Sequence, residues 1–182
     1  MFPTSTDLQD PAQSVFAAVC PAQLNISASV QIKAEVSRVL FALAIPEYME
    51  AWLRFPEIDR IECHAELRSF DRFRIDMYGS GCIRRSLYGS CLLSKSNRIT
   101  YLWEREPAGD RPKSTVEIRL WGGPESCTVN LRHTGFWNQT EAEWHSEMWS
   151  CSLENLCRLM EGMGVSAGRR ASPGGSEISS RS

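Results

Sequence analysis

The sequence has no long apolar run, and this absence argues against a membrane-spanning helix. The only apolar run near the N-terminus is Val15 to Val19, far short of the roughly 18 residues that a membrane span needs. The residues before it include Asp7 and Asp10 but no Lys or Arg, whereas a signal peptide begins with positive charge. We therefore expect a cytoplasmic protein that has no membrane partner.

The chain also lacks a basic excess. Its 20 Lys and Arg residues stand against 22 Asp and Glu residues, which gives a formal net charge of -2, and the arginines are scattered. Proteins that bind nucleic acid carry a basic patch or stripe. Nucleic acid is therefore not an expected partner.

Signatures of disulfides, metals and catalysis are missing too. The seven Cys residues are odd in number, none forms a Cys-x-x-Cys pair, and the three His residues fall on separate predicted elements. We therefore interpret the cysteines as reduced, buried thiols. No Gly-rich phosphate loop follows a strand and no nucleophile elbow is present. We expect no metal, no cofactor and no catalytic site of a known motif.

The 182 residues, 42% of them hydrophobic, suffice for one domain with a real core. Apolar and polar residues alternate from Leu24 to Lys33, which predicts a half-buried strand. Residues 36–43 then repeat apolar positions at helical steps, and Pro46 opens a second short helix, PEYMEAWL. Two short helices therefore follow the first strand.

From residue 60 to residue 136 the pattern has period two, and Gly, Ser, Asn and Pro residues separate the segments. This pattern predicts an antiparallel sheet whose strands are Ile61–Glu66, Phe70–Tyr78, Arg84–Ser94, Arg98–Glu106, Ser114–Trp121 and Cys127–Thr134.

The last regular segment is a long amphipathic helix over Thr140–Gly162. Thr140 is expected to be the N-cap, with Glu143 completing a capping box. Its apolar face would contact the apolar face of the sheet. This order of elements predicts an α+β helix-grip fold, in which a curved antiparallel sheet of about seven strands wraps around the C-terminal helix. Residues 1–23 are expected to be flexible, residues 24–162 to form the domain, and residues 163–182 to be a disordered tail.

Several motifs resemble those of the START-like (SRPBCC) domains related to the activator of heat-shock protein 90 ATPase. The resembling residues are Val39, Ala42-Leu43, Pro46-Glu47, Trp52, the segment Tyr88 to Trp103, Thr134-Gly135-Phe136 and His145 to Trp149. Together they cover roughly residues 24 to 162. Met148 departs from the family pattern, which usually has Gly there, and so does Phe70-Asp71, which replaces a glycine pair.

The resemblance implies a cavity between the sheet and the last helix, and the helix face interrupts bulky side chains with Ser152 and His145. We interpret this region as a binding site for an apolar or aromatic, lipid-like small molecule. The alternative is that the same residues only fill the core. The candidate ligand-binding residues are Trp52, Ile75, Met77, Tyr101, Trp103, Ile118, Leu131, His133, His145, Trp149, Ser152 and Leu156.

Three functions remain open from the sequence. Binding of an apolar small molecule leads. A co-chaperone-like role, with a chaperone or another protein as partner, is the second and is implied by the family's name. The third is a cyclase- or hydrolase-type enzyme in which His133 and His145 meet as an acid–base pair. Nothing in the sequence requires an enzyme.

Overall fold

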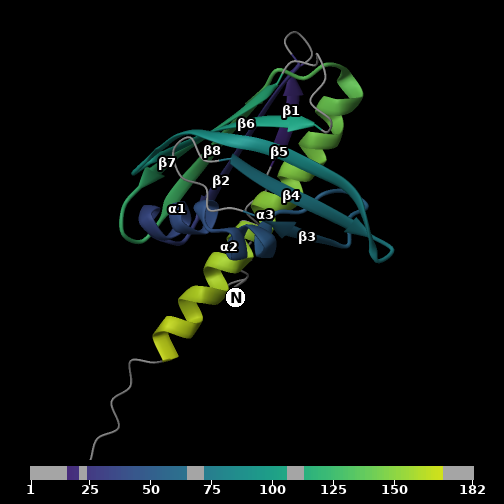
Figure 1. Ribbon diagram of the computed structural model, residues 1–182. Coiled ribbons are helices and arrows are strands. Elements are labelled where there is room, and N and C mark those ends of the chain that lie inside the picture. Colours follow the sequence, from purple (N-terminus) through teal and green to yellow (C-terminus); the bar gives the residue numbers. More distant parts are fainter. Residues whose placement is uncertain (1–15, 21–23, 65–71, 106–112, 170–182) are drawn as a thin grey trace, which may run out of the picture.

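The computed structural model of the chain describes residues 16–20, 24–64, 72–105 and 113–169. It forms one eight-stranded antiparallel sheet with three helices (Figure 1). The strands are β1 (Phe16–Cys20), β2 (Asn25–Ile32), β3 (Arg60–Cys63), β4 (Arg72–Gly79), β5 (Cys82–Lys95), β6 (Arg98–Arg105), β7 (Ser114–Gly122) and β8 (Cys127–Thr134). The helices are α1 (Val36–Ala44), α2 (Pro46–Trp52) and α3 (Gln139–Arg169).

The sheet is curved around α3, and its strand order is β1-β2-β8-β7-β6-β5-β4-β3. The register shifts after Met77 in the β4–β5 pair and after Cys91 in the β5–β6 pair, and such irregularities bend and twist a sheet. Gly89 lies between them, where an added Cβ would come within 2.4 Å of the Phe73 ring. A side chain at position 89 would therefore collide with a core aromatic ring.

The core follows the predicted periodicities. Every second residue of β2 and β8 is buried on the concave face, from Ile26 to Ile32 and from Cys127 to His133. On α3 the buried residues are Ala142, His145, Met148, Trp149, Ser152, Leu153, Leu156 and Met160. The helix-grip fold, with its long C-terminal helix and two short helices between the first predicted strand and the second, is confirmed.

The structure differs from the sequence analysis in three places. Residues 16–20 form the edge strand β1, which pairs with β2 inside the segment that we expected to be flexible. The N-cap of α3 is Asn138, two residues before the predicted N-cap Thr140. Asn138 Oδ1 accepts a hydrogen bond from the Glu141 N–H, and the helix begins at Gln139. It also continues through Gly162 to Arg169. The predictions for residues 1–15 and 170–182 lie outside the described residues.

Ser152 connects the two helical regions of the chain. Its Oγ accepts a hydrogen bond from the Arg54 N–H (2.9 Å) and donates one to the Arg54 carbonyl oxygen (3.1 Å). Arg54 follows α2, so a fully buried serine of α3 fixes the start of the loop that leads to β3. Both backbone groups would lack a partner without it.

We expect Ser152→Ala to lower the free energy of unfolding by about 1 kcal/mol, because two partly buried hydrogen bonds to the Arg54 backbone would be lost. Ser150 is the matched control, since its Oγ bonds only to the Ser146 carbonyl oxygen of the same helix. Ser150→Ala should stay within about 0.5 kcal/mol of wild type. Chemical denaturation measures both, and equal losses in the two variants would contradict this role of Ser152.

Candidate functional site

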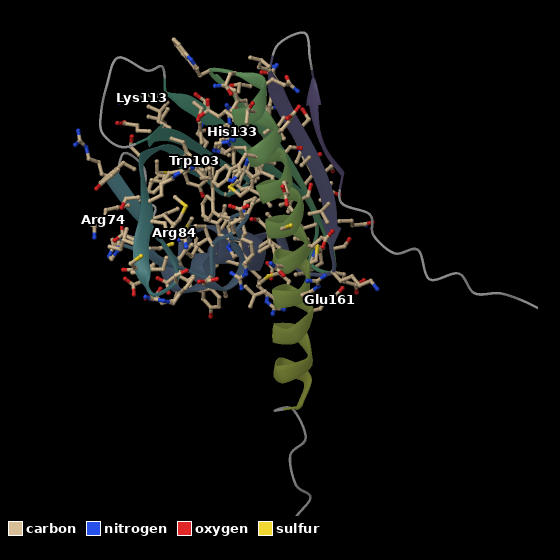
Figure 2. All side chains as sticks on the ribbon, turned by 90° about the vertical axis from the view of Figure 1, so that its right-hand side faces the viewer. Arg74, Arg84, Trp103, Lys113, His133 and Glu161 are labelled. Atoms are coloured by element: carbon tan, nitrogen blue, oxygen red, sulfur yellow. The ribbon has the colours of Figure 1, made fainter. Side chains whose placement is uncertain are left out.

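Four of the predicted site residues meet in an aromatic cluster near the N-terminal end of α3. Trp103 from β6 stacks on Trp149 of α3, with ring centroids 5.2 Å apart. The rings of His133, from β8, and His145, from α3, are 4.9 Å apart. Figure 2 shows Trp103 and His133 between the sheet and α3. All four are among the twelve candidate ligand-binding residues named from the sequence.

The hydrogen bonds of His133 determine its protonation. The Trp149 Nε1–H donates to His133 Nδ1 at 3.0 Å, so Nδ1 carries no proton. The proton therefore lies on Nε2, which is 2.8 Å from Ser114 Oγ and donates to it. Burial, and after it the neighbouring His145, holds the pKa of His133 well below its ordinary value. His133 is a neutral side chain that has both nitrogens occupied.

His145 is held in the same way by its own helix. Its Nδ1–H donates to the Glu141 carbonyl oxygen at 2.9 Å, and the side chain is buried. The predicted acid–base pair therefore meets in space, but His133 has no nitrogen left for a substrate proton. This geometry favours a structural role for the pair over a catalytic one.

The other predicted residues are also buried in the core, and partners within the chain account for the polar ones. Trp52 Nε1 donates to the Ala42 carbonyl oxygen at 2.9 Å, and the Tyr101 hydroxyl faces the Leu43 carbonyl oxygen at 3.4 Å. Ser152 bonds to Arg54, as described above. The remaining residues are apolar core members: Ile75, Met77, Ile118, Leu131 and Leu156.

Met148 also fills this region. It is fully buried on the inward stripe of α3, where the resembling family usually has Gly. The side chains around Trp149 thus pack against one another. Three hollows lie along described residues, and of the predicted ligand-binding residues only Met77 and Leu131 are among their linings.

One of these hollows is a cleft between α3 and the β4–β5 pair, with a volume of about 240 Å³. Its apolar lining includes Met77, Ile58 and Trp144. Glu57 has a left-handed backbone (φ 61°), which is rare for a residue other than Gly and marks a constrained loop. The complete lining is Pro56, Glu57, Ile58, Met77, Arg84, Arg85 and Trp144.

Arg85 is the unexpected residue of this cleft. It pairs with the buried Met77 in the β4–β5 register, and residues directly opposite each other in a sheet point to the same face. Its guanidinium carbon lies 5.4 Å from the centre of the Trp144 ring, within the range of a cation–π contact. An arginine therefore lies on the concave side of the sheet, against an aromatic ring of α3.

A row of rings connects the cleft to the aromatic cluster. Trp144 stacks on Phe55 at 5.6 Å between centroids, and Phe55 lies 6.5 Å from Trp103. The sequence analysis missed Arg85, Trp144 and Phe55 as site residues. Strand alternation could have identified Arg85, because it shares the parity of Leu87 and Cys91, which are buried.

The third histidine, His64, belongs to a separate polar network that joins β4 and β5 to the end of β3. Its Nε2 lies 2.7 Å from the buried Asp76 carboxylate, which also accepts from Ser86 Oγ at 2.7 Å and pairs with Arg74. Burial raises the pKa of Asp76, but the hydrogen bonds from Ser86 and His64 and the charge of Arg74 outweigh it, so the pKa is lowered. None of these residues lines the cleft.

Thiol chemistry is also disfavoured at the cysteines nearest to these elements. Burial, followed by the charges of Glu50 and Glu47, raises the pKa of Cys63 to about 12. Burial and Glu161 raise the pKa of Cys157 to about 11. Such thiols stay protonated near neutral pH and are poor nucleophiles.

Within the part of the chain that the structure describes, no three His, Cys, Asp or Glu side chains are grouped as a metal site requires. No described helix combines the length and the apolar character that crossing a membrane needs.

Comparison with known proteins assigns the chain to a family. The sequence profile described as Activator of Hsp90 ATPase homolog 1-like protein matches residues 33–161. The chain belongs to this family. No curated protein matches the sequence.

Solved structures share the fold of this Activator of Hsp90 ATPase homolog 1-like domain. Protein CV1439 from Chromobacterium violaceum has a TM-score of 0.64 and 21% identity, over 75% of this chain and 96% of that chain. A protein from Rhodobacter sphaeroides has a TM-score of 0.66 and 16% identity, over 82% and 99%. DynU16, from the dynemicin biosynthetic locus, has a TM-score of 0.61 and 19% identity, over 75% of this chain and 47% of that chain. At these identities the likeness shows the fold alone.

The buried, neutral His133 makes the stability of the domain depend on pH. In the unfolded chain its pKa is about 6.5, so below that pH the unfolded state binds a proton that the folded state does not. The free energy of unfolding should therefore fall as the pH drops below about 6.5, by up to about 1.4 kcal/mol per pH unit from this group.

Denaturation curves at several pH values from about 5 to about 8, on both sides of the reference pKa, measure how the free energy of unfolding changes with pH. His133→Gln should flatten this dependence, since the glutamine does not titrate, while His64 and His145 remain in both proteins. Ring nitrogen chemical shifts of wild type should show the neutral Nε2–H form of His133 throughout. A protonated His133 ring in the folded protein at the acidic end would refute the argument.

Proposed function

We propose that this domain binds a small molecule that carries an apolar ring and an acidic group, and that the cleft between α3 and the β4–β5 pair holds it. The observation that carries the proposal is Arg85 on the concave face, against the Trp144 ring. The Arg85 side chain is exposed, so its guanidinium can reach a ligand in the cleft as well as the Trp144 ring. An acidic ligand would give this arginine an ionic partner.

The lining of the cleft supports this ligand chemistry. Ile58 and Trp144 are partly exposed at the cleft and can contact a ring, whereas Met77 is fully buried. Arg84 and Arg85 lie beside them with one carboxylate, that of Glu57. Two positive charges against one negative charge favour an anion. A volume of about 240 Å³ is below the roughly 300 Å³ at which typical ligand pockets begin, so we expect a ligand of one or two rings.

The fold and the family support small-molecule binding in general terms. A helix-grip sheet holds its ligands against the last helix, and one structural neighbour comes from the dynemicin biosynthetic locus. The ligand position proposed here differs from the one predicted from the sequence. It lies at the end of the row of rings formed by Trp144, Phe55 and Trp103, and not among the packed side chains around Trp149.

The matched probes 2-naphthoate and 2-naphthamide test the proposal, because they share the ring and differ in charge. Calorimetric titration of wild type should show tighter binding of the acid. Arg85→Gln should weaken 2-naphthoate at least about tenfold, as expected for loss of a charge-assisted hydrogen bond, and leave 2-naphthamide nearly unchanged. Trp144→Ala should weaken both probes.

Arg158→Gln is the control, because Arg158 is an exposed residue of α3 that follows Trp144 by several turns and pairs, among the described residues, with Glu154 and Asn155 of the same helix. It should bind both probes like wild type. Equal binding of acid and amide by wild type would reject the acidic ligand. Binding of neither probe would reject the cleft and favour the second prediction, a chaperone or another protein as partner, which the family's name implies.

A further inference from the structure

The convex face of the sheet, opposite α3, carries a polar trough over β2, β8 and β7. Two hollows of about 460 and 510 Å³ share Glu117, Arg119 and Arg132, so they form one continuous depression. Small polar side chains occupy the space between these charges: Ser27, Ser29, Asn130, Thr115 and Thr134. An ordinary solvent-facing sheet surface is filled by longer side chains, whereas here short ones leave room.

Strand register determines how the charged groups are arranged. Ser29 is opposite Asn130, which is opposite Arg119, while Ser27 is opposite Arg132, which is opposite Glu117. Arg119 and Arg132 are therefore diagonal neighbours on adjacent antiparallel strands, about 7–8 Å apart. Two guanidinium groups on flexible side chains at that separation can reach the same ligand, because each has a planar fork of N–H donors.

The charges of the trough do not cancel. Glu117 is the carboxylate that lines it, and both Arg98 and Arg119 pair with this carboxylate. Burial raises the pKa of Glu117, but its hydrogen bonds and the charges of Arg119 and Arg98 outweigh it, so the pKa is lowered and the group stays ionised.

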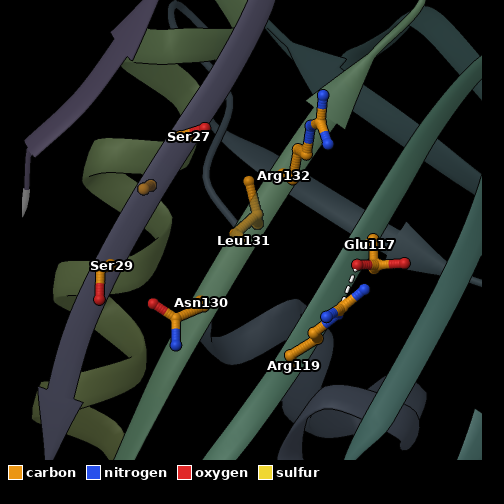
Figure 3. A pocket seen from close by; sticks show the side chains of 8 residues that line it. Ser27, Ser29, Glu117, Arg119, Asn130, Leu131 and Arg132 are labelled. Atoms are coloured by element: carbon orange, nitrogen blue, oxygen red, sulfur yellow. Dashed lines mark hydrogen bonds and ion pairs between the residues drawn. The ribbon is translucent and has the colours of Figure 1, made fainter.

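Arg132 differs from the other two arginines. It is exposed and makes no ion pair with any residue that the structure describes. Figure 3 shows Arg119 turned towards Glu117, while Arg132 extends along β8 away from that carboxylate. The trough is lined by two arginines, Arg119 and Arg132, and by one glutamate, which leaves a local charge of +1 on a chain whose net charge is -2.

We propose that this trough binds a soluble phosphate-type oxyanion, of the size of a diphosphate group. Arg132 and Arg119 would donate charge-assisted hydrogen bonds to its oxygens, and the Ser27 and Ser29 hydroxyls and the Asn130 amide would donate to the remaining ones. The ligand is hydrophilic, because the trough is lined by hydroxyls, amides, two guanidiniums and the Glu117 carboxylate, while its apolar members Ala28 and Leu131 are buried. The site is distinct from the cleft, which lies on the concave side and offers aromatic and aliphatic surface.

Calorimetric titration of the full chain with inorganic pyrophosphate tests the site. Wild type should bind one pyrophosphate per chain, and added salt should weaken the binding because the contacts are ionic and exposed. Arg132→Gln should weaken it at least about tenfold, and Arg132→Lys should fall between the two, since lysine keeps the charge but loses the fork. Arg132 has no partner within the described chain, so these variants should fold.

A second pair of variants separates the trough from the general surface charge. Ser27→Asp places a carboxylate in the trough and should abolish binding. Gln31→Glu makes the same change in charge on the same face of β2, outside the residues that line the trough, and should bind like wild type. Circular dichroism checks that each variant is folded.

Three results would overturn the proposal: no binding of pyrophosphate by wild type, equal binding by wild type and Arg132→Gln, or equal loss in the two β2 variants. Phosphatidate is the membrane source of the same chemistry. If the protein sediments with phosphatidate vesicles but does not bind free pyrophosphate, the ligand is a lipid headgroup and not a soluble oxyanion.

Discussion

Burial of the concave sheet face against one helix is the interaction on which the rest of this domain depends. The strands present a continuous apolar surface, and α3 covers it with a stripe that runs from Ala142 to Met160. Apolar burial contributes about 25 cal/mol per Å², so covering this face stabilises a sheet that, in the described part of the chain, has no second sheet packed on it. Because one helix covers this face, the orientation of α3 about its own axis decides which of its polar side chains become buried.

This orientation explains the two interpretations of the polar residues in the stripe. In the sequence they indicate a ligand site, whereas in the structure they form hydrogen bonds within the chain. Ser152 and His145 occur among bulky apolar residues, which is typical both of a cavity lining and of a core with buried hydrogen bonds. A buried polar group without a partner is costly, and each of these has a partner in the chain. Ser152 bonds to Arg54, and His145 bonds to Glu141. Only the tertiary fold reveals these partners, since Arg54 and Ser152 are 98 positions apart.

Periodicity therefore predicted the elements well and the site only in part. The period-two strands and the long amphipathic helix follow from burial on one side, which any sequence window reveals. The strand β1, FAAVC, has no alternation and gave no signal; it exists because the edge of β2 accepts it. The N-cap was misplaced because Asn138 with Glu141 and Thr140 with Glu143 have the same spacing, and only the hydrogen bond to Asn138 separates them. Arg85 shares the parity of the buried Leu87, but an arginine in a strand is ordinarily exposed, so its residue type pointed to solvent and not to a site.

The departure at position 148 relates the packed core to the proposed cleft. A glycine on the inward stripe of a grip helix leaves a space beside the helix, whereas Met148 is completely buried there. Because side chains in a core pack at close to crystal density, a methionine in place of glycine removes room for a ligand nearby. The proposed ligand position is lined by Arg85 and Trp144 and not by Met148. The proposal of a small anionic ring is consistent with this packing, because a long lipid would need the volume that Met148 and the Trp103–Trp149 stack fill.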